Sequence, residues 1–253
     1  MEPFAWHQPV DLRFGDGCSN ELSATLGHQP VVVLAFEPAG ALGLRQRWQY
    51  ALGARLQAWV PVADRLSSIA YARELVPLVW PHLKPDTVLV AVGGGTTLDL
   101  AKVLRCKPLD SDFEALAKAL RGQAPWPAMQ QAPLWLLPTT AGTGSELTRW
   151  ATVWDTEAQP PVKRSLDEPW GYAQRAFVDP ALTLSCPAAL TRDTALDTLA
   201  HALEALWNRH ANPVSTELAV AAATRVLTHL PALLAQPQDL GLRTQMSLAA
   251  VQA

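Results

Sequence analysis

The sequence is poor in cysteine and has no excess of positive charge, and both features narrow the classes of protein to consider. Its 253 residues include three cysteines, Cys18, Cys106 and Cys186, and no pair of them has zinc-knuckle spacing. A sparse, odd cysteine count is typical of a reducing compartment and predicts a cytoplasmic protein. With a net charge of −3, no nucleic-acid partner is expected.

Long apolar runs are missing as well. No uninterrupted run reaches the ~18 residues that a membrane span needs, and the first residues lack the basic and apolar regions of a secretory signal. We therefore expect no membrane association. Hydrophobic residues still make up 49% of the chain and charged residues 17%, which is typical of a globular protein with a sizeable core.

The first 187 residues alternate strand and helix patterns. Apolar runs predict strands at 31–36, 57–60, 87–92 and 134–137, and helical patterns lie at 43–58, at 64–79 and from 111. Runs that are apolar throughout are typical of parallel strands covered on both faces, and their alternation with helices predicts βαβ units. The proline-rich stretch 153–178 predicts a hairpin or a long loop. The expected fold class is α/β, with a doubly wound, mostly parallel sheet.

After Pro187 the pattern is entirely helical. Periodicity predicts one helix over 191–207, a second that Ser215 caps and that runs to about 230, and a third from about 242 to 253. We therefore expect an α/β domain over 1–187 and part of an all-helical domain over 188–253.

Two clusters of hydrogen-bond donors follow predicted strands. Gly93, Gly94 and Gly95 precede a helix that begins with two threonines, and backbone N–H groups in such a turn favour a phosphate. Residues 138–146 hold four hydroxyl residues and two glycines, a composition that suits a pyrophosphate or nicotinamide site. A plain glycine turn and a solvated loop are the alternatives. Both clusters lie at carboxyl ends of strands, where open α/β sheets bind ligands.

A third candidate is the pair Asp197 and His201, one helical turn apart. Their side chains project from one face and provide half of a metal site. A surface hydrogen bond between the two is the alternative.

Together these residues resemble the iron-containing (group III) alcohol dehydrogenase family. Residues 93–102 are similar to its Gly-Gly-Gly-Ser-x-x-Asp-x-Ala-Lys motif, with Thr96 in place of serine. Residues 138–146 match its Pro-Thr-Thr-Ala-Gly-Thr-Gly-Ser-Glu motif at every position, and residues 196–204 resemble its metal-binding helix.

The resemblance implies a dehydroquinate synthase-like fold and an NAD(P)-linked alcohol dehydrogenase or aldehyde reductase that acts on a small aldehyde or alcohol. It also implies Fe²⁺, or sometimes Zn²⁺, which polarises the substrate oxygen. Glu37 follows a predicted strand and favours NAD over NADP. The cofactor-binding residues that the resemblance implies are Gly94, Gly95, Thr96, Asp99, Thr139, Thr140, Thr143, Ser145 and Lys163, and the implied metal ligands are Asp197 and His201.

The family's third and fourth metal ligands are histidines well beyond His201, and the sequence ends at Ala253 before either. We therefore expect a truncated helical domain and a weakly held metal. One alternative is a cofactor-binding remnant without turnover. A lyase of the dehydroquinate synthase kind is another, and residues 138–146 favour the dehydrogenase over it.

Three further segments, 148–155, 163–166 and 201–208, are similar to the phosphonoacetaldehyde reductase branch of this family. A phosphonate needs cationic partners, and Arg149 is the expected substrate-binding residue, with Lys163 and Arg164 near it. The alternative is a neutral short-chain aldehyde, with both arginines as solvated charges. Leucines of the incomplete helical part predict exposed apolar surface and a homo-oligomer.

Overall fold

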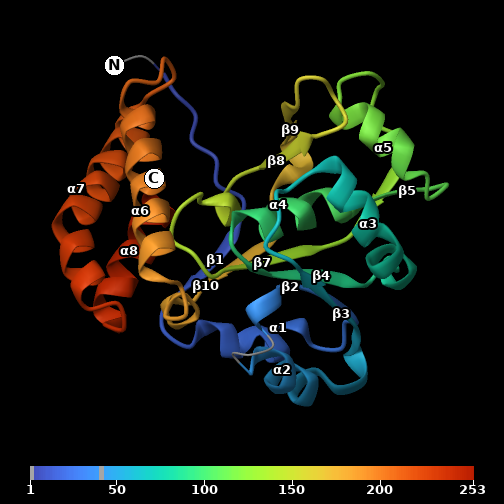
Figure 1. Cartoon of the computed structure of the whole chain (residues 1–253), viewed down its shortest axis with the longest axis horizontal. Coiled ribbons are helices and arrows are strands. Elements are labelled where there is room, and N and C mark those ends of the chain that lie inside the picture. The colour runs from blue at the N-terminus through green and yellow to red at the C-terminus, as the bar shows by residue number, and fades with distance from the viewer. Residues whose placement is uncertain (1–2, 40–42) are drawn as a thin grey trace.

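A computed structural model describes residues 3–39 and 43–253, which form a six-stranded sheet with its helices and a group of three longer helices beside it (Figure 1). The strands lie in the order β1 (Asp11–Phe14), β10 (Arg175–Val178), β7 (Leu134–Pro138), β4 (Val88–Gly93), β2 (Val31–Phe36) and β3 (Leu56–Val62). Each neighbouring pair is parallel. The expected α/β class with a mostly parallel sheet is confirmed.

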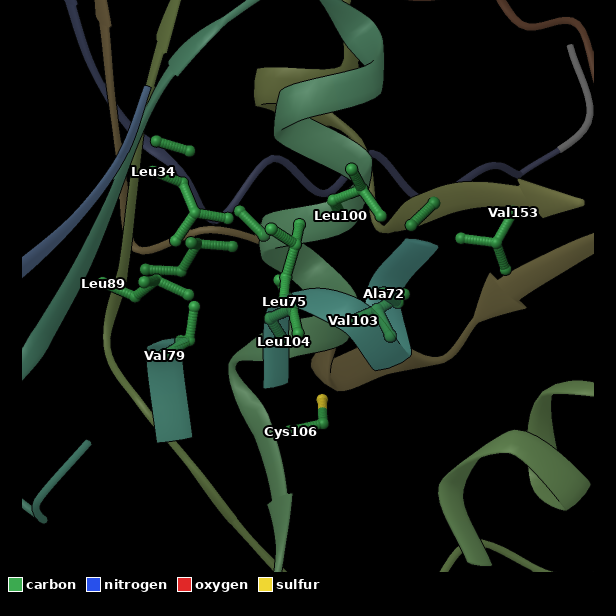
Figure 2. Close-up of a cluster of buried hydrophobic side chains, with 14 of the residues drawn as sticks. Leu34, Ala72, Leu75, Val79, Leu89, Leu100, Val103, Leu104, Cys106 and Val153 are labelled. Carbon is green, nitrogen blue, oxygen red and sulfur yellow. The ribbon is translucent and has the colours of Figure 1, made fainter. Parts of the chain in front are cut away.

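Helices cover both faces of the sheet, because side chains of successive strand residues point to opposite faces. Val31 and Val33 pack with α1 (Leu22–Leu26) and α2 (Leu44–Leu52). Leu34 and Leu89 pack on the other face with α3 (Ile69–Val79) and α4 (Gly95–Leu104), in the cluster of Figure 2. Helix α5 (Phe113–Leu120) packs at the edge of the same cluster. The middle strands are thus buried on both sides, as their uninterrupted apolar runs predicted.

The first predicted helix is shorter than its sequence pattern. Helix α2 ends at Leu52, because Gly53 has a φ of 55°, which only glycine adopts without strain. The chain then enters β3, which is longer than the predicted strand at 57–60. The start of the predicted helix at 43 adjoins residues 40–42, which lie outside the described residues.

Three helix starts differ from the prediction because a different side chain caps each one. Ser68 accepts a hydrogen bond from the Tyr71 N–H at 3.0 Å, so α3 begins at Ile69 and not at 64. Asp112 caps α5. Asn212, and not Ser215, caps α7 (Pro213–Ala235); Ser215 is the reciprocal partner in the capping box.

The stretch 153–178 contains a hairpin and then a sheet strand. β8 (Trp150–Asp155) pairs antiparallel with β9 (Val162–Asp167), and β10 follows. The sequence pattern did not predict β10 and β1, which are four residues long, or a small sheet of β5 (Cys106–Pro108) and β6 (Met129–Gln131). Strands of this length give too few residues for a pattern to emerge.

Helices α6 (Ala188–Leu206), α7 and α8 (Leu240–Gln252) pack together beside the sheet (Figure 1). Their small core contains Ala195, Val226, Leu233, Met246 and Ala249. Two leucines expected to be bare differ sharply, since Leu233 is fully buried and Leu227 is 66% exposed.

Helix α7 is long and apolar enough to cross a membrane when judged by length and composition alone, which the search for uninterrupted apolar runs did not find. A single helix of this kind is weak evidence for a span, and α7 packs against α6 and α8 through Ala222 and Val226, although only 33% of its apolar window is buried. The finding is therefore weak support for a membrane span.

Candidate functional site

A cavity of about 940 Å³ opens between the carboxyl edge of the sheet and α6. The start of α4, the loop 142–148, one face of the β8–β9 hairpin and α6 supply much of its lining, and the N-terminal segment, α7 and the end of α8 also contribute. Among the expected site residues, the lining includes Gly95, Thr96, Asp99, Thr143, Ser145, Lys163, Asp197 and His201. The fold thus brings most of the residues expected from separate motifs to one cavity.

The start of α4 forms the wall nearest the sheet. β4 ends at Gly93, and Gly94 is the N-cap of α4 without any side-chain capping bond. The first N–H groups of this ten-residue helix therefore lack a side-chain partner, which suits an anion. A Cβ on Gly95 would lie 2.9 Å from Cγ2 of Thr143, so glycine lets the two donor-rich segments approach.

A buried network ties α4 to the neighbouring loop and hairpin. The Ser145 hydroxyl donates to Asp99 at 2.7 Å, and the Thr152 N–H donates to the other oxygen of Asp99 at 2.9 Å. Both oxygens of Asp99 are thus engaged within the protein, although the side chain also lines the cavity. Burial raises the pKa of Asp99.

Lys102, one turn after Asp99, is fully buried and was not expected as a site residue. Its Nζ lies 2.6 Å from the Ser145 carbonyl, 2.9 Å from the Thr148 carbonyl and 2.6 Å from the Trp150 carbonyl. Burial lowers its pKa to about 8, and the charge of Asp99 opposes that shift. The sequence signal for its role is that a lysine stands among the apolar residues of α4.

The hairpin supplies the cavity wall opposite the loop. Lys163 and Ser165 of β9 face the cavity together with Trp150, Thr152 and Trp154 of β8. Among residues 3–39 and 43–253, no carboxylate forms an ion pair with Lys163, although its charge acts on Asp99 and His201. Lys163 is therefore a cation available to a ligand.

The candidate metal ligands lie on the part of α6 that faces the cavity. Oδ1 of Asp197 is 3.6 Å from Nε2 of His201, and each side chain is 45% exposed. The Asp197 carboxylate raises the pKa of His201. A carboxylate and an imidazole suit Fe²⁺ or Zn²⁺, but no group of three or more ligating side chains occurs in the described part of the chain. The residues fit half of such a site.

Three expected cofactor residues lie off the cavity in the described structure. Gly94 is the cap of α4, and Thr140 packs beside it. Thr139 is buried, and its N–H donates to the Gly93 carbonyl at 3.0 Å. From these positions the three residues can hold the donor-rich segments in place, but they do not face a ligand in the cavity.

Arg149, the expected substrate-binding residue, is not among the described residues that line the cavity. Its Nε lies 2.6 Å from Asp167, and its guanidinium stacks over the Trp150 ring. The hairpin register causes this, because Asp167 is paired directly with Trp150, next to Arg149. Arg164 alternates with Lys163 along β9 and also lies outside the cavity lining.

The N-terminal segment reaches the cavity without any sequence signal for it. Trp6, His7 and Gln8 line one side. The Gln8 side chain donates to the Leu147 carbonyl at 3.0 Å, and His7 meets the Tyr172 ring edge-on. Glu204, one turn beyond His201, also lines the cavity and was not expected.

Family comparisons match both parts of the chain. Residues 9–180 match the iron-containing alcohol dehydrogenase model, and residues 191–253 match the model for the C-terminal part of the same family. The chain belongs to this family. It is 35% identical over 171 residues to choline dehydrogenase of Bacillus subtilis, a match that covers 65% of this chain and 40% of that protein.

Solved structures agree in fold. Sulfoacetaldehyde reductase from Bifidobacterium kashiwanohense, in complex with NAD⁺, superposes with a TM-score of 0.85 at 26% identity, over all of this chain and 66% of that one. NADH-dependent butanol dehydrogenase A from Thermotoga maritima gives 0.83 at 20% identity, over 99% of this chain and 63% of that one. The chain therefore spans less than two thirds of the length of the relatives that it matches.

Proposed function

We propose that this chain belongs to an NAD(P)-linked alcohol dehydrogenase or aldehyde reductase whose reaction takes place in the cavity beside α4. One observation carries the proposal: the uncapped start of α4, Lys163, and the pair Asp197 and His201 all line the same cavity. The fold alone would not support it, since one fold hosts many activities.

The residues divide between binding and orientation. The N–H groups at Gly95 and Thr96 receive the cofactor pyrophosphate, and Thr143 and Ser145 face its nicotinamide side. Glu37 directly follows β2 but is not among the described residues that line the cavity, so our proposal of NAD in preference to NADP rests on its place after the strand alone. The bound cofactor supplies the hydride that reduces the carbonyl carbon.

Asp197 and His201 would hold a divalent iron or zinc ion. That ion supplies Lewis-acid polarisation of the substrate oxygen when bound. Two ligands give weak binding, because such sites use three or four protein ligands. The remnant hypothesis, in which the chain binds cofactor without turnover, rests on this shortfall.

A second candidate refines the substrate to an anionic two-carbon aldehyde, with phosphonoacetaldehyde reduced to 2-hydroxyethylphosphonate. Lys163 favours it as a cavity cation that forms no ion pair among the described residues, and so does the structural likeness to a sulfoacetaldehyde reductase. Arg149 and Arg164 lend no support, because both lie outside the cavity lining. Asp99 and Glu204 oppose it, since their carboxylates line the same space as Lys163. A neutral short-chain aldehyde is the simpler substrate.

The test is a titration of the purified chain with NADH and NADPH, followed by NADH oxidation with propanal and with phosphonoacetaldehyde in the presence of added Fe²⁺ or Zn²⁺. We expect NADH binding, substoichiometric metal after dialysis, and slow turnover at most. Binding without turnover would favour the remnant, and absence of binding to folded protein would refute the proposal. Turnover of both aldehydes at equal efficiency would exclude the phosphonate candidate.

A further inference from the structure

The loop after β7 meets α6 with no space between them. In Figure 1 this yellow-green loop reaches toward α6 beside α4. Gly142 is the contact point: a Cβ there would lie 2.9 Å from Cβ of Thr194 and 3.3 Å from both its main-chain Cα and O. The main chain of a helix cannot move aside locally, so the loop cannot move closer to α6 here unless the helix moves too.

Thr198 supplies the polar link across this contact. Its hydroxyl lies 3.2 Å from the Gly142 carbonyl and 3.4 Å from the Ala141 carbonyl, and 3.2 Å from the Thr194 carbonyl in its own helix. The side chain is only 1% exposed. Among hydrogen bonds in the described part of the chain, Thr198 is the one donor to either loop carbonyl.

The two sides of this link carry different parts of the candidate site. Thr198 directly follows Asp197 and lies one turn before His201 on α6. The loop continues from Gly142 into Thr143 and Ser145, which line the cavity near the start of α4. One hydroxyl therefore lies between the segment that carries the metal pair and the segment that faces the cofactor.

We propose that Thr198 is a positioning residue that fixes the cofactor-facing loop against the helix bearing Asp197 and His201. The expected effect on NADH binding rests on the proposed function, in which this loop contacts NAD(H). The Thr198 hydroxyl has one proton for the Gly142, Ala141 and Thr194 carbonyls. Without that proton the loop loses its hydrogen bond to α6 and relaxes away from the helix. Thr143 and Ser145 then lose their alignment with the N–H groups of α4.

Two substitutions separate this role from simple packing. Thr198→Val keeps the volume and removes the hydroxyl, whereas Thr198→Ser keeps the hydroxyl and removes a methyl group. A positioning role predicts that Val weakens NADH binding about fivefold while Ser stays within about twofold of the wild type. A packing role predicts the reverse order, because the serine variant leaves a cavity. NADH fluorescence titration of the purified 253-residue chain measures both, and no metal is needed.

Thr191→Val is the matched control. It removes another buried hydroxyl from α6, one that contacts Arg243 and the Cys186 carbonyl and neither of the loop carbonyls. We expect it to lower the melting temperature and to leave the NADH affinity unchanged. Equal weakening of NADH binding by Thr191→Val and Thr198→Val would mean that general destabilisation is responsible, and the proposal would be wrong.

A second readout keeps the inference testable if the wild-type chain binds no NADH, an outcome that would instead contradict the proposed function. Amide hydrogen exchange of residues 139–147 reports on the loop without cofactor. Faster exchange in Thr198→Val, with exchange in Thr198→Ser and Thr191→Val unchanged, supports the link. Equal exchange in Thr198→Val and the wild type overturns it.

Discussion

The two sides of the cavity differ in how firmly their polar side chains are held. On the sheet side, Lys102 and Ser145 are buried and Asp99 is partly buried; Ser145 is hydrogen-bonded to both of the others, and Lys102 and Asp99 are also hydrogen-bonded to the main chain. On the helical side, Asp197 and His201 are each nearly half exposed, and their closest charged contact is with each other at 3.6 Å. The cofactor side is therefore preorganised within the described residues, whereas the metal side needs further ligands to become a complete site.

Replacing Lys102 tests the buried network and should have the largest effect. Lys102→Met removes the charged donor for the Ser145, Thr148 and Trp150 carbonyls, of which the Ser145 carbonyl keeps the Thr148 N–H at 3.3 Å. We expect a loss of about 3–5 kcal/mol in unfolding free energy by urea denaturation, as when one partner of a buried charged group is removed. The exposed Lys118 on α5 is the control, and Lys118→Met should cost under about 0.5 kcal/mol. Similar losses of unfolding free energy in the two variants would show that the buried network contributes little to stability.

Glu146 tests whether burial on the sheet side also makes stability depend on pH. The side chain is 3% exposed, and burial raises its pKa from 4.5 to about 7. A raised carboxyl pKa means that the folded protein retains a proton that the unfolded chain has lost. The stability that protonated Glu146 contributes to the folded protein is therefore complete below pH 4.5, and it is lost as the pH rises through 7.

The total loss attributable to Glu146 is about 3 kcal/mol, at about 1.4 kcal/mol for each unit of pKa shift. Glu146→Gln cannot titrate, so its unfolding free energy should fall less than that of the wild type between pH 5 and 7. Urea denaturation at several pH values measures the difference. Parallel pH profiles for the two proteins would show that Glu146 does not titrate in this range.

The sequence predicted four of the six strands of the sheet and the two donor-rich segments that line the cavity, because these depend on local signals. The all-apolar runs at β2, β4 and β7 located the middle strands, and the two donor-rich segments lie at strand ends, where they meet. The sequence did not predict the ion pair of Arg149 with Asp167, since the hairpin register that brings them together depends on contacts between distant residues. Lys102 and Trp6 were missed because their roles depend on tertiary burial and on the path of the N-terminal segment.

Gly95→Val tests the preorganised side directly. A Cβ at Gly95 would lie 2.9 Å from Thr143, and the larger valine also covers the start of α4, where the pyrophosphate is proposed to bind. We expect NADH affinity to fall at least about tenfold, a loss of about 1.4 kcal/mol, by isothermal calorimetry. His201→Ala, on the other side of the cavity, should leave NADH affinity in metal-free buffer within about twofold. An unchanged affinity in Gly95→Val would place the cofactor elsewhere.

Exposed apolar side chains on α6 and α7 predict that the protein associates through its helical part. Leu196, Leu203, Trp207 and Leu227 are between 36% and 70% exposed on α6, just after it, and on α7. Such residues favour association, so we predict oligomers by size-exclusion chromatography with light scattering. Leu227→Gln should shift the distribution toward the monomer, whereas Tyr50→Gln, at an exposed aromatic on α2, should not. A wild-type monomer at all concentrations would contradict the prediction.

Arg149→Ala should have the smallest effect. It distinguishes the sequence-based hypothesis that Arg149 binds substrate from the structure, in which Arg149 pairs with Asp167. The Arg149–Asp167 ion pair is partly exposed, with the two side chains 35% and 46% accessible, and pairs of this kind contribute at most about 1 kcal/mol. Because Arg149 is not among the described residues lining the cavity, neither NADH affinity nor phosphonoacetaldehyde binding should change by more than about twofold in calorimetry. Lys163→Met, which removes a charge that does face the cavity, should weaken at least one of them. If Arg149→Ala instead abolishes phosphonoacetaldehyde binding, the hairpin must rearrange around the ligand, and the sequence-based assignment of Arg149 would be restored.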